Sequence, residues 1–345
     1  MHLETLDKLR SMIAEQGWDA LVCLSPENIA YSAGFVVPSQ TLMRWRHAAL
    51  VLTRDDVAMV CVDMEEATVR RERPDWEVRT WGEFTENPMD VLAATLAELG
   101  VREGVVGIEL DYLAVSNDRR LRDASPTTTF VAADQALTGA RRIKSATELA
   151  RLESLSRISE RSILDALASV RAGDTEMDIA ATLTSRIFEQ GAENFKLMIV
   201  ATGERSQLPN VGPTTRRLEP GDICRVEIFS VAAGYQAGVC RTAVVGEPSA
   251  QAQRVYDNLV ECKRLVLESI KPGVSARSVY EVYRRHFDSL GMPAIGFVGH
   301  SIGVNLHESP YLGPYGEEEL GSGMVLGIEP LVYRSGHGFG MQIKD

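Results

Sequence analysis

Hydrophobic positions recur at two spacings along the chain, and the spacing changes from segment to segment. Leu6, Leu9 and Ile13 follow the three-to-four-residue spacing of an amphipathic helix. Apolar runs at 47–53 and 57–63, separated by charged residues, predict two buried strands joined in a hairpin. Helix and strand signals then alternate, with helices predicted at 64–72, 88–99 and 114–122 and strands near 76–81, 104–109 and 127–131. This alternation predicts an α/β domain that ends near residue 139.

The second half of the chain begins with a helix-start signal and contains longer elements. Ser145 followed by Glu148 is the pattern of a capping box, in which each side chain binds the other residue's backbone amide. It predicts a long helix, and we place the domain boundary just before residue 140. The block 222–246 predicts a hairpin with Gly234 at its turn. Helices are then expected at 250–270 and 275–289, before a tail of short strands and loops.

Length and composition limit the class of protein. At about 150 residues per domain, a chain of 345 residues corresponds to roughly two domains. Lys and Arg number 36 against 48 Asp and Glu, and this net charge of −12 argues against a nucleic-acid partner. The 5 cysteines include no CxxC pair, which argues against a thiolate zinc site and fits a reducing, cytoplasmic location. No apolar run approaches the ~20 residues of a membrane span, so no membrane partner is expected.

Five local motifs, in order along the chain, resemble the creatinase and aminopeptidase P family. They are RRIKSATE (141–148), LPNVGPTTRRLEPGD (208–222), VEIFSVAAGYQAGVCRT (226–242), GHSIGVNLHESP (299–310) and GMVLGIEPLVY (323–333). The resemblance implies the pita-bread fold over residues 140–345. It also implies the creatinase- and prolidase-type N-terminal domain over residues 1–139. The expected fold class is therefore mixed α/β throughout.

The resemblance also implies where the two-metal centre of the family's peptidases would lie. That centre uses two Asp, one His and two Glu. Here Glu227 stands at the first Asp position and Gly238 at the second, while His300 and Glu329 match the His and the first Glu, and Lys344 replaces the last Glu. Two divalent ions need several anionic oxygens, and a lysine brings a positive charge instead. We therefore predict no metal cofactor, with a single divalent ion on Glu227, His300 and Glu329 as the alternative.

Four residues are predicted to be catalytic. Glu227 lies in an apolar run, where an unpaired charge is rare, and is expected to attack the substrate or to act as a general base. His300 would move a proton, His307 would assist it or bind a carboxylate, and Glu329 would hold a cationic group. The structural alternatives are a surface strand residue for Glu227, a core histidine for His300 and a paired buried carboxylate for Glu329.

Five further residues are predicted to bind the substrate: Arg46, Asn210, Cys240, Arg241 and Lys344. Arg46 matches a creatinase arginine that reaches into the partner subunit's site, so a homodimer is expected. Cys240 would line the pocket, because it lies two residues from Gly238 on a strand. Asn210 would orient the scissile bond and Arg241 a carboxylate. The Lys344 ammonium would replace metal charge between the carboxylates.

The sequence therefore predicts a creatinase-like, metal-independent hydrolase that cleaves a C–N bond in a small, polar, carboxylate-bearing molecule. Two alternatives remain. One is an Xaa-Pro aminopeptidase or dipeptidase with an atypical metal site, which bound metal in the purified protein would indicate. The other is a catalytically inactive pita-bread protein that binds a small zwitterion without turnover. The presence of His300, His307 and Glu329 argues against this inactive protein.

Overall fold

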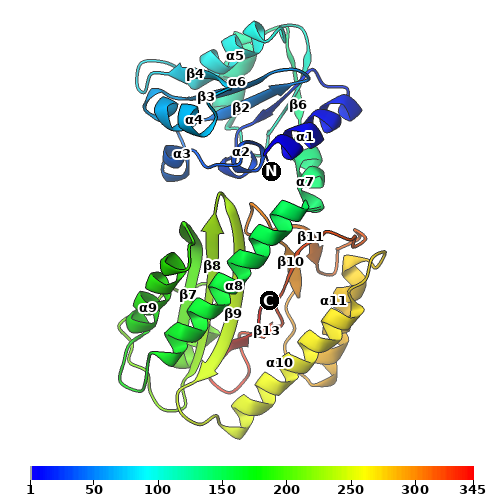
Figure 1. The fold of residues 1–345 in the computed structure, drawn as a ribbon. Coiled ribbons are helices and arrows are strands. Elements are labelled where there is room, and N and C mark those ends of the chain that lie inside the picture. The colour runs from blue at the N-terminus through cyan, green and yellow to red at the C-terminus, as the bar shows by residue number, and fades with distance from the viewer. Residues whose placement is uncertain (1) are drawn as a thin grey trace. The chain divides into compact units, whose positions relative to one another are not determined.

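The fold is that of a computed structural model, which describes residues 2–345 (Figure 1). The chain forms two compact units, unit 1 up to Arg141 and unit 2 over residues 142–345. Buried hydrophobic residues form a core cluster in unit 1 and a cluster under each helix pair of unit 2. Both units combine helices with sheets, which confirms the mixed α/β class.

Unit 1 is built on a six-stranded sheet with the order β4-β3-β2-β1-β5-β6. The predicted hairpin is present, with β2 (Ala49–Thr53) antiparallel to β3 (Val57–Val62). The remaining strands are β1 (Ala20–Cys23), β4 (Glu77–Trp81), β5 (Val105–Ile108) and β6 (Thr129–Ala132). The helices are α1 (His2–Gln16), α2 (Pro26–Ala33), α3 (Pro38–Leu42), α4 (Glu66–Glu72), α5 (Pro88–Glu98), α6 (Val115–Ala124) and α7 (Asp134–Arg142). All four residues of β1 are buried, as expected for a central strand.

Helices α2, α3 and α7 were not predicted from the sequence. Helix α2 is short, and its apolar spacing is masked by buried polar residues. Its start has a clear physical cause, because the Ser25 hydroxyl accepts a hydrogen bond from the Asn28 amide and Pro26 occupies the first turn. The capping residues of α2 can therefore be recognised in the sequence, although its helical periodicity cannot.

The first half of unit 2 is an antiparallel sheet, β7 (Asn194–Thr202), β8 (Ile223–Ala232) and β9 (Tyr235–Val244), with helices α8 (Ala146–Ala168) and α9 (Glu176–Glu189) beside it (Figure 1). The capping box predicted at Ser145 and Glu148 opens α8. The β8–β9 turn consists of Ala233 and Gly234, with φ of 48° and 81°. Such left-handed values favour glycine and match the twist of a tight hairpin.

The second half of unit 2 carries helices α10 (Ala250–Ser269) and α11 (Ala276–Ser289), with short strands β10 (Gly299–Ser301), β11 (Glu308–Leu312), β12 (Leu326–Ile328), β13 (Leu331–Val332) and β14 (Met341–Gln342). Leu259 of α10 and Phe287 of α11 are buried in one cluster with Ile328 and Met341. A bridge between Cys240 and Lys344 attaches the C-terminal segment to β9. Side chains of β8, β10 and this segment therefore meet within unit 2.

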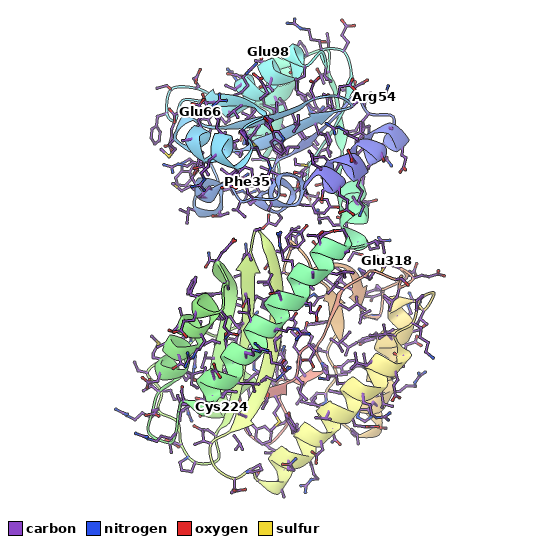
Figure 2. All side chains as sticks on the ribbon, in the orientation of Figure 1. Phe35, Arg54, Glu66, Glu98, Cys224 and Glu318 are labelled. Atoms are coloured by element: carbon purple, nitrogen blue, oxygen red, sulfur yellow. The ribbon has the colours of Figure 1, made fainter. Side chains whose placement is uncertain are left out.

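Charged side chains lie on the surface, and the cysteines lie inside. Arg54 and Glu98 project from unit 1, whereas Cys224 lies in the interior of unit 2 (Figure 2). All described cysteines are unpaired and buried. Across residues 2–345, the structure contains no helix with the length and apolarity that crossing a membrane requires.

Candidate active site

Five residues of unit 2 meet at one place, which we call the centre: Glu227, His300, His307, Glu329 and Lys344. Glu227 comes from β8, His300 from the middle of β10, and Glu329 from the residue after β12. Lys344 follows β14, and His307 precedes β11. His300 is 0% exposed and Lys344 1% exposed, whereas His307 is exposed at the edge. The centre thus contains all four residues predicted to be catalytic. It also contains Lys344, which was predicted to bind the substrate.

Lys344 contacts three other residues of the centre. Its Nζ lies 3.1 Å from His300 Nε2 and donates to Glu329 Oε2 at 3.2 Å. Glu227 Oε1 lies 3.4 Å from the same nitrogen. The ammonium also lies 4.5 Å from the centroid of the Phe229 ring, whose face attracts cations. A buried ammonium requires such partners, because its desolvation is otherwise costly.

The charges in the centre separate the proton affinities of its two carboxylates. Burial raises the pKa of Glu227, and this outweighs the attraction of Lys344. Burial would also raise the pKa of Glu329, but Lys344 and His300 together lower it to about 2. The pKa of Lys344 is raised, because the two carboxylates outweigh the effect of burial. Glu329 is therefore fixed as an anion and Lys344 as a cation, and Glu227 is the more basic carboxylate.

The two histidines stack, with ring centroids 3.7 Å apart. The backbone carbonyl of Ser301 lies 2.8 Å from His300 Nδ1, so Nδ1 carries the proton and Nε2 offers a lone pair to the centre. Desolvation lowers the pKa of His307 to about 4, with His300 and Lys344 adding to the effect. The His307 ring therefore presents an uncharged nitrogen near neutral pH.

Gln342 and Arg225 support the centre, and the sequence reasoning missed both. Gln342 Nε2 donates to Glu227 Oε2 at 3.2 Å and to Glu329 Oε2 at 3.0 Å. Its Oε1 accepts from the buried Arg225 guanidinium at 3.0 Å. Each lies two residues before a residue of the centre, so on extended backbone it faces the same side. That spacing was the signal that could have found them.

The other predicted substrate-binding residues lie elsewhere or are shielded. Cys240 is fully buried, and burial raises the pKa of its thiol well above the ordinary value, so it is not a thiolate. Arg241 forms ion pairs with Glu160 and Asp345, and its guanidinium also donates to the backbone carbonyl of Lys344 at 2.8 Å. Arg46 of unit 1 forms a bidentate ion pair with Glu83, at 2.8 and 2.9 Å. Its predicted role across a dimer stays a prediction.

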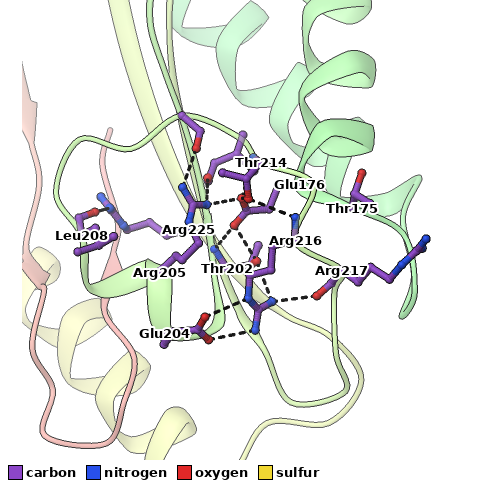
Figure 3. A network of polar contacts seen from close by, with 12 residues as sticks. Thr175, Glu176, Thr202, Glu204, Arg205, Leu208, Thr214, Arg216, Arg217 and Arg225 are labelled. Atoms are coloured by element: carbon purple, nitrogen blue, oxygen red, sulfur yellow. Dashed lines mark hydrogen bonds and ion pairs between the residues drawn. The ribbon is translucent and has the colours of Figure 1, made fainter.

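Asn210 lies exposed on the loop 203–214. A buried glutamate, Glu176, holds this loop in place (Figure 3). Glu176, in the first turn of α9, is 0% exposed and accepts from the backbone amides of Thr202 and Thr214, both at 2.9 Å. It also accepts from both threonine hydroxyls and pairs with Arg205. These contacts fix both ends of the 203–214 segment. Asn210 is placed by this loop, not by contact with the centre.

A cavity of about 520 Å³ lies next to the same loop. Leu208, Pro209, Ile295 and Tyr333 line it with apolar surface. Arg334 adds a cation, and Glu204, which is paired with Arg216, adds an anion. Arg225 connects this wall to the centre, because its guanidinium stacks 5.4 Å from the Tyr333 centroid, donates to the Leu208 and Pro209 carbonyls, and reaches Gln342. The wall of the cavity and the centre therefore share one buried arginine.

Residues 150–345 match the description "Metallopeptidase family M24", and residues 5–143 match the creatinase/prolidase N-terminal domain. The chain belongs to metallopeptidase family M24. Among its relatives, an Xaa-Pro dipeptidase of Pyrococcus furiosus is 26% identical over 99% of this chain and 94% of its own. A creatinase of Bacillus sp. is 28% identical over 94% of this chain and 82% of its own. The crystal structure of an X-Pro aminopeptidase from Thermotoga maritima superimposes with a TM-score of 0.85 at 26% identity, covering 98% and 93%.

These comparisons confirm the predicted family and the two-domain, pita-bread fold class. They also support the coarser prediction that the chain is a hydrolase acting on C–N bonds. The finer prediction, a metal-independent creatinase-like hydrolase, is wrong. Xaa-Pro dipeptidases are among the relatives, X-Pro aminopeptidases and prolidases are among the structural neighbours, and both favour the peptidase alternative.

The prediction of no metal cofactor is also wrong. M24 is a metallopeptidase family, and the ligand atoms of His300, His307 and Glu329 all lie within 4.8 Å of one another. Glu329 Oε1 is buried 3.1 Å from His300 Nε2, and among residues 2–345 it has no hydrogen-bond partner. An unsatisfied carboxylate oxygen beside an imidazole lone pair suits one divalent ion. The structure therefore places His307 in the candidate ligand group, in the position that the alternative prediction from the sequence gave to Glu227.

A second metal ion does not fit the centre. Gly238 pairs with Phe229 across the β8–β9 hairpin, and a Cβ at Gly238 would lie 2.4 Å from the Phe229 ring. No ligand side chain has room there. Lys344 already occupies the space between Glu227 and Glu329. The described residues therefore offer a donor set for one ion only.

Proposed function

We propose that this M24 protein is an Xaa-Pro dipeptidase-type hydrolase, which cleaves the amide bond before proline in a small peptide. The observation that carries the proposal is the group formed by His300, His307 and Glu329 in a metallopeptidase fold. The relatives named as Xaa-Pro dipeptidase and X-Pro aminopeptidase support the substrate class. The creatinase-like reaction is not part of the proposal.

In this proposal, His300, His307 and Glu329 would hold one divalent ion, which would polarise the scissile carbonyl. Glu227 lies outside that ligand group and is held by Gln342, so it is placed to take a proton from the attacking water. His307 is the exposed member of the centre, so the peptide approaches past its ring. Lys344 keeps Glu329 ionised.

The cavity beside Leu208 and Tyr333 supports a substrate with an apolar part. Its walls are largely hydrophobic, and Arg334 at its lining would attract a free carboxylate. A proline residue at the C-terminus of a dipeptide presents both an apolar ring and a carboxylate. We therefore assign the cavity to the end of the peptide that leaves as proline.

The test is proline release from a panel of Xaa-Pro dipeptides, with added Mn²⁺, against creatine as the comparison substrate. His300→Ala and Glu329→Gln should lower kcat/KM by more than roughly 100-fold, because losing a metal ligand has a larger effect than losing a residue that only supports a ligand. His337→Ala, an exposed histidine outside the centre, is the matched control and should retain wild-type activity. Wild-type rates in His300→Ala, or turnover of creatine alone, would refute the assignment.

We also propose a homodimer in which Arg46 contacts the partner's substrate. Arg46 is bound to Glu83 within its own unit, so this role requires the ion pair to open or to orient the guanidinium. Light scattering should give twice 37.9 kDa. Arg46→Ala should then raise KM with little change in kcat, whereas Arg54→Ala, an exposed arginine of the same unit, should not. A monomer with full activity contradicts this arrangement.

A further inference from the structure

The centre already contains a cation that is part of the chain. Lys344 is 1% exposed, and its Nζ lies within 3.4 Å of His300, Glu227 and Glu329. The Cys240–Lys344 bridge, with backbone hydrogen bonds in both directions, fixes the residue at its Cα. The Phe229 ring closes the remaining side of the ammonium. The cation is therefore positioned from both ends of its side chain.

Charge in the centre limits what else can enter. The carboxylates of Glu227 and Glu329 are balanced by Lys344 and by Arg225, which acts through Gln342. One divalent ion adds two positive charges to this buried group, and a second would bring four. Glu227 Oε1 and Glu329 Oε2, the oxygens that would bind a second ion, both face the ammonium.

We propose that Lys344 serves as the fixed second cation of the centre, so that the protein holds one divalent ion, on His300, His307 and Glu329, and not two. The inference rests on the proposed function, because it assigns the metal content of the same site. Lys344 is a positioning residue in this scheme. It holds the two carboxylates and acts on the reaction only through them.

The test measures metal binding directly, so that it does not depend on finding a substrate. Chelator-stripped protein is titrated with Mn²⁺ or Zn²⁺ by calorimetry, and bound metal is counted by elemental analysis after gel filtration. The wild-type chain should bind one ion. Lys344→Glu, which places a carboxylate where the ammonium stood, should bind two. Lys344→Met removes the charge without adding a ligand and should bind its one ion at least roughly tenfold more tightly.

Lys271→Met and Lys271→Glu are the matched controls, because Lys271 is exposed after α10 and they make the same changes away from the centre. Both should bind one ion with wild-type affinity. Two ions, or none, on the wild-type chain would overturn the inference, and so would folded Lys344 variants that bind metal like the wild type. Should Lys344 variants fail to fold, the wild-type stoichiometry still decides. An inactive protein that binds one ion would refute the proposed peptidase function and leave this inference standing.

Discussion

Single side chains in the centre have distinct tasks although they lie within a few ångströms. Glu329 is held as an anion by Lys344, while Glu227 retains a raised pKa and the capacity to accept a proton. The difference arises from the charged and imidazole groups nearby: Glu329 has both Lys344 and His300 at about 3 Å, whereas Glu227 has only the longer contact with Lys344. Environment, not residue type, separates the two carboxylates.

Gln342 is the residue on which both carboxylates depend for orientation. Replacing it by Leu removes a donor to each carboxylate and leaves the buried Arg225 guanidinium without one acceptor. We predict a loss of about 1–3 kcal/mol in the free energy of unfolding, measured by urea denaturation, together with a lower kcat. Gln253→Leu, at an exposed glutamine of α10, is the control. Equal stability of Gln342→Leu and wild type would contradict the contacts described.

The cysteine side chains give a prediction for solution chemistry. Burial raises the pKa of Cys61, Cys224 and Cys262 to about 12, and raises those of Cys23 and Cys240 well above the ordinary thiol value. Native protein should therefore resist iodoacetamide even as the pH rises from 7 to 9, because the thiols stay protonated and covered. In denaturant all 5 should react, since exposed thiols ionise near pH 8.5. Rapid labelling of the native protein at pH 8 would contradict this burial.

The same raised values have a consequence for stability. A thiol with a higher pKa in the folded state stabilises the fold fully below the unfolded value and loses that contribution as pH rises toward the folded value. The midpoint temperature of thermal unfolding should therefore decrease as the pH rises above about 8.5.

At the scale of elements, the first turn of α9 fixes the loop that carries Asn210. Glu176 is fully buried there and binds Thr202, Thr214 and Arg205. Glu176→Ala should lower the free energy of unfolding by about 3–5 kcal/mol, because it leaves buried donors and a charge unpaired. Thermal unfolding checks this, with Glu189→Ala as the control, since that exposed ion pair at the other end of α9 should contribute little. A matching melting temperature in both variants would contradict the role of Glu176.

Elements with strong local signals were predictable, and those fixed by tertiary contact were not. The β2–β3 and β8–β9 hairpins and the capped α8 follow from alternation, turn residues and a capping box. Helix α2 has its cap but no clear apolar stripe, and β12 to β14 are too short for a period to appear. In the centre, the motif order located Glu227, His300 and Glu329. The charge states of the carboxylates depend on distances between side chains, which the spacing of residues along the sequence does not give. The same is true of the choice of His307 instead of Glu227 as a candidate metal ligand.

At the scale of the whole molecule, the unfolding of each unit can be followed by a separate signal. All 4 tryptophans, at positions 18, 45, 76 and 81, lie in unit 1, whereas the candidate metal ligands lie in unit 2. The cores are distinct as well. Tryptophan fluorescence should therefore follow unit 1, and calorimetry should resolve a further transition for unit 2.

Metal addition sharpens this prediction. A divalent ion at 100 times its dissociation constant should stabilise unit 2 by about 2.7 kcal/mol and raise its calorimetric transition, while the fluorescence transition stays in place. His300→Ala, which loses a ligand, should abolish the shift. If both transitions move together with metal, the units unfold as one and the prediction fails.

The facing pair of Phe229 and Gly238 restricts the mutational routes open to this protein. A carboxylate at 238 would collide with the ring, so Gly238→Asp alone destabilises the hairpin. Shrinking Phe229 first leaves a void and takes the aromatic face from Lys344. A second ion bound through a carboxylate at 238 would therefore require changes at 229 and 238 in addition to Lys344→Glu. Gly238 is therefore expected to stay glycine for as long as Phe229 packs against it.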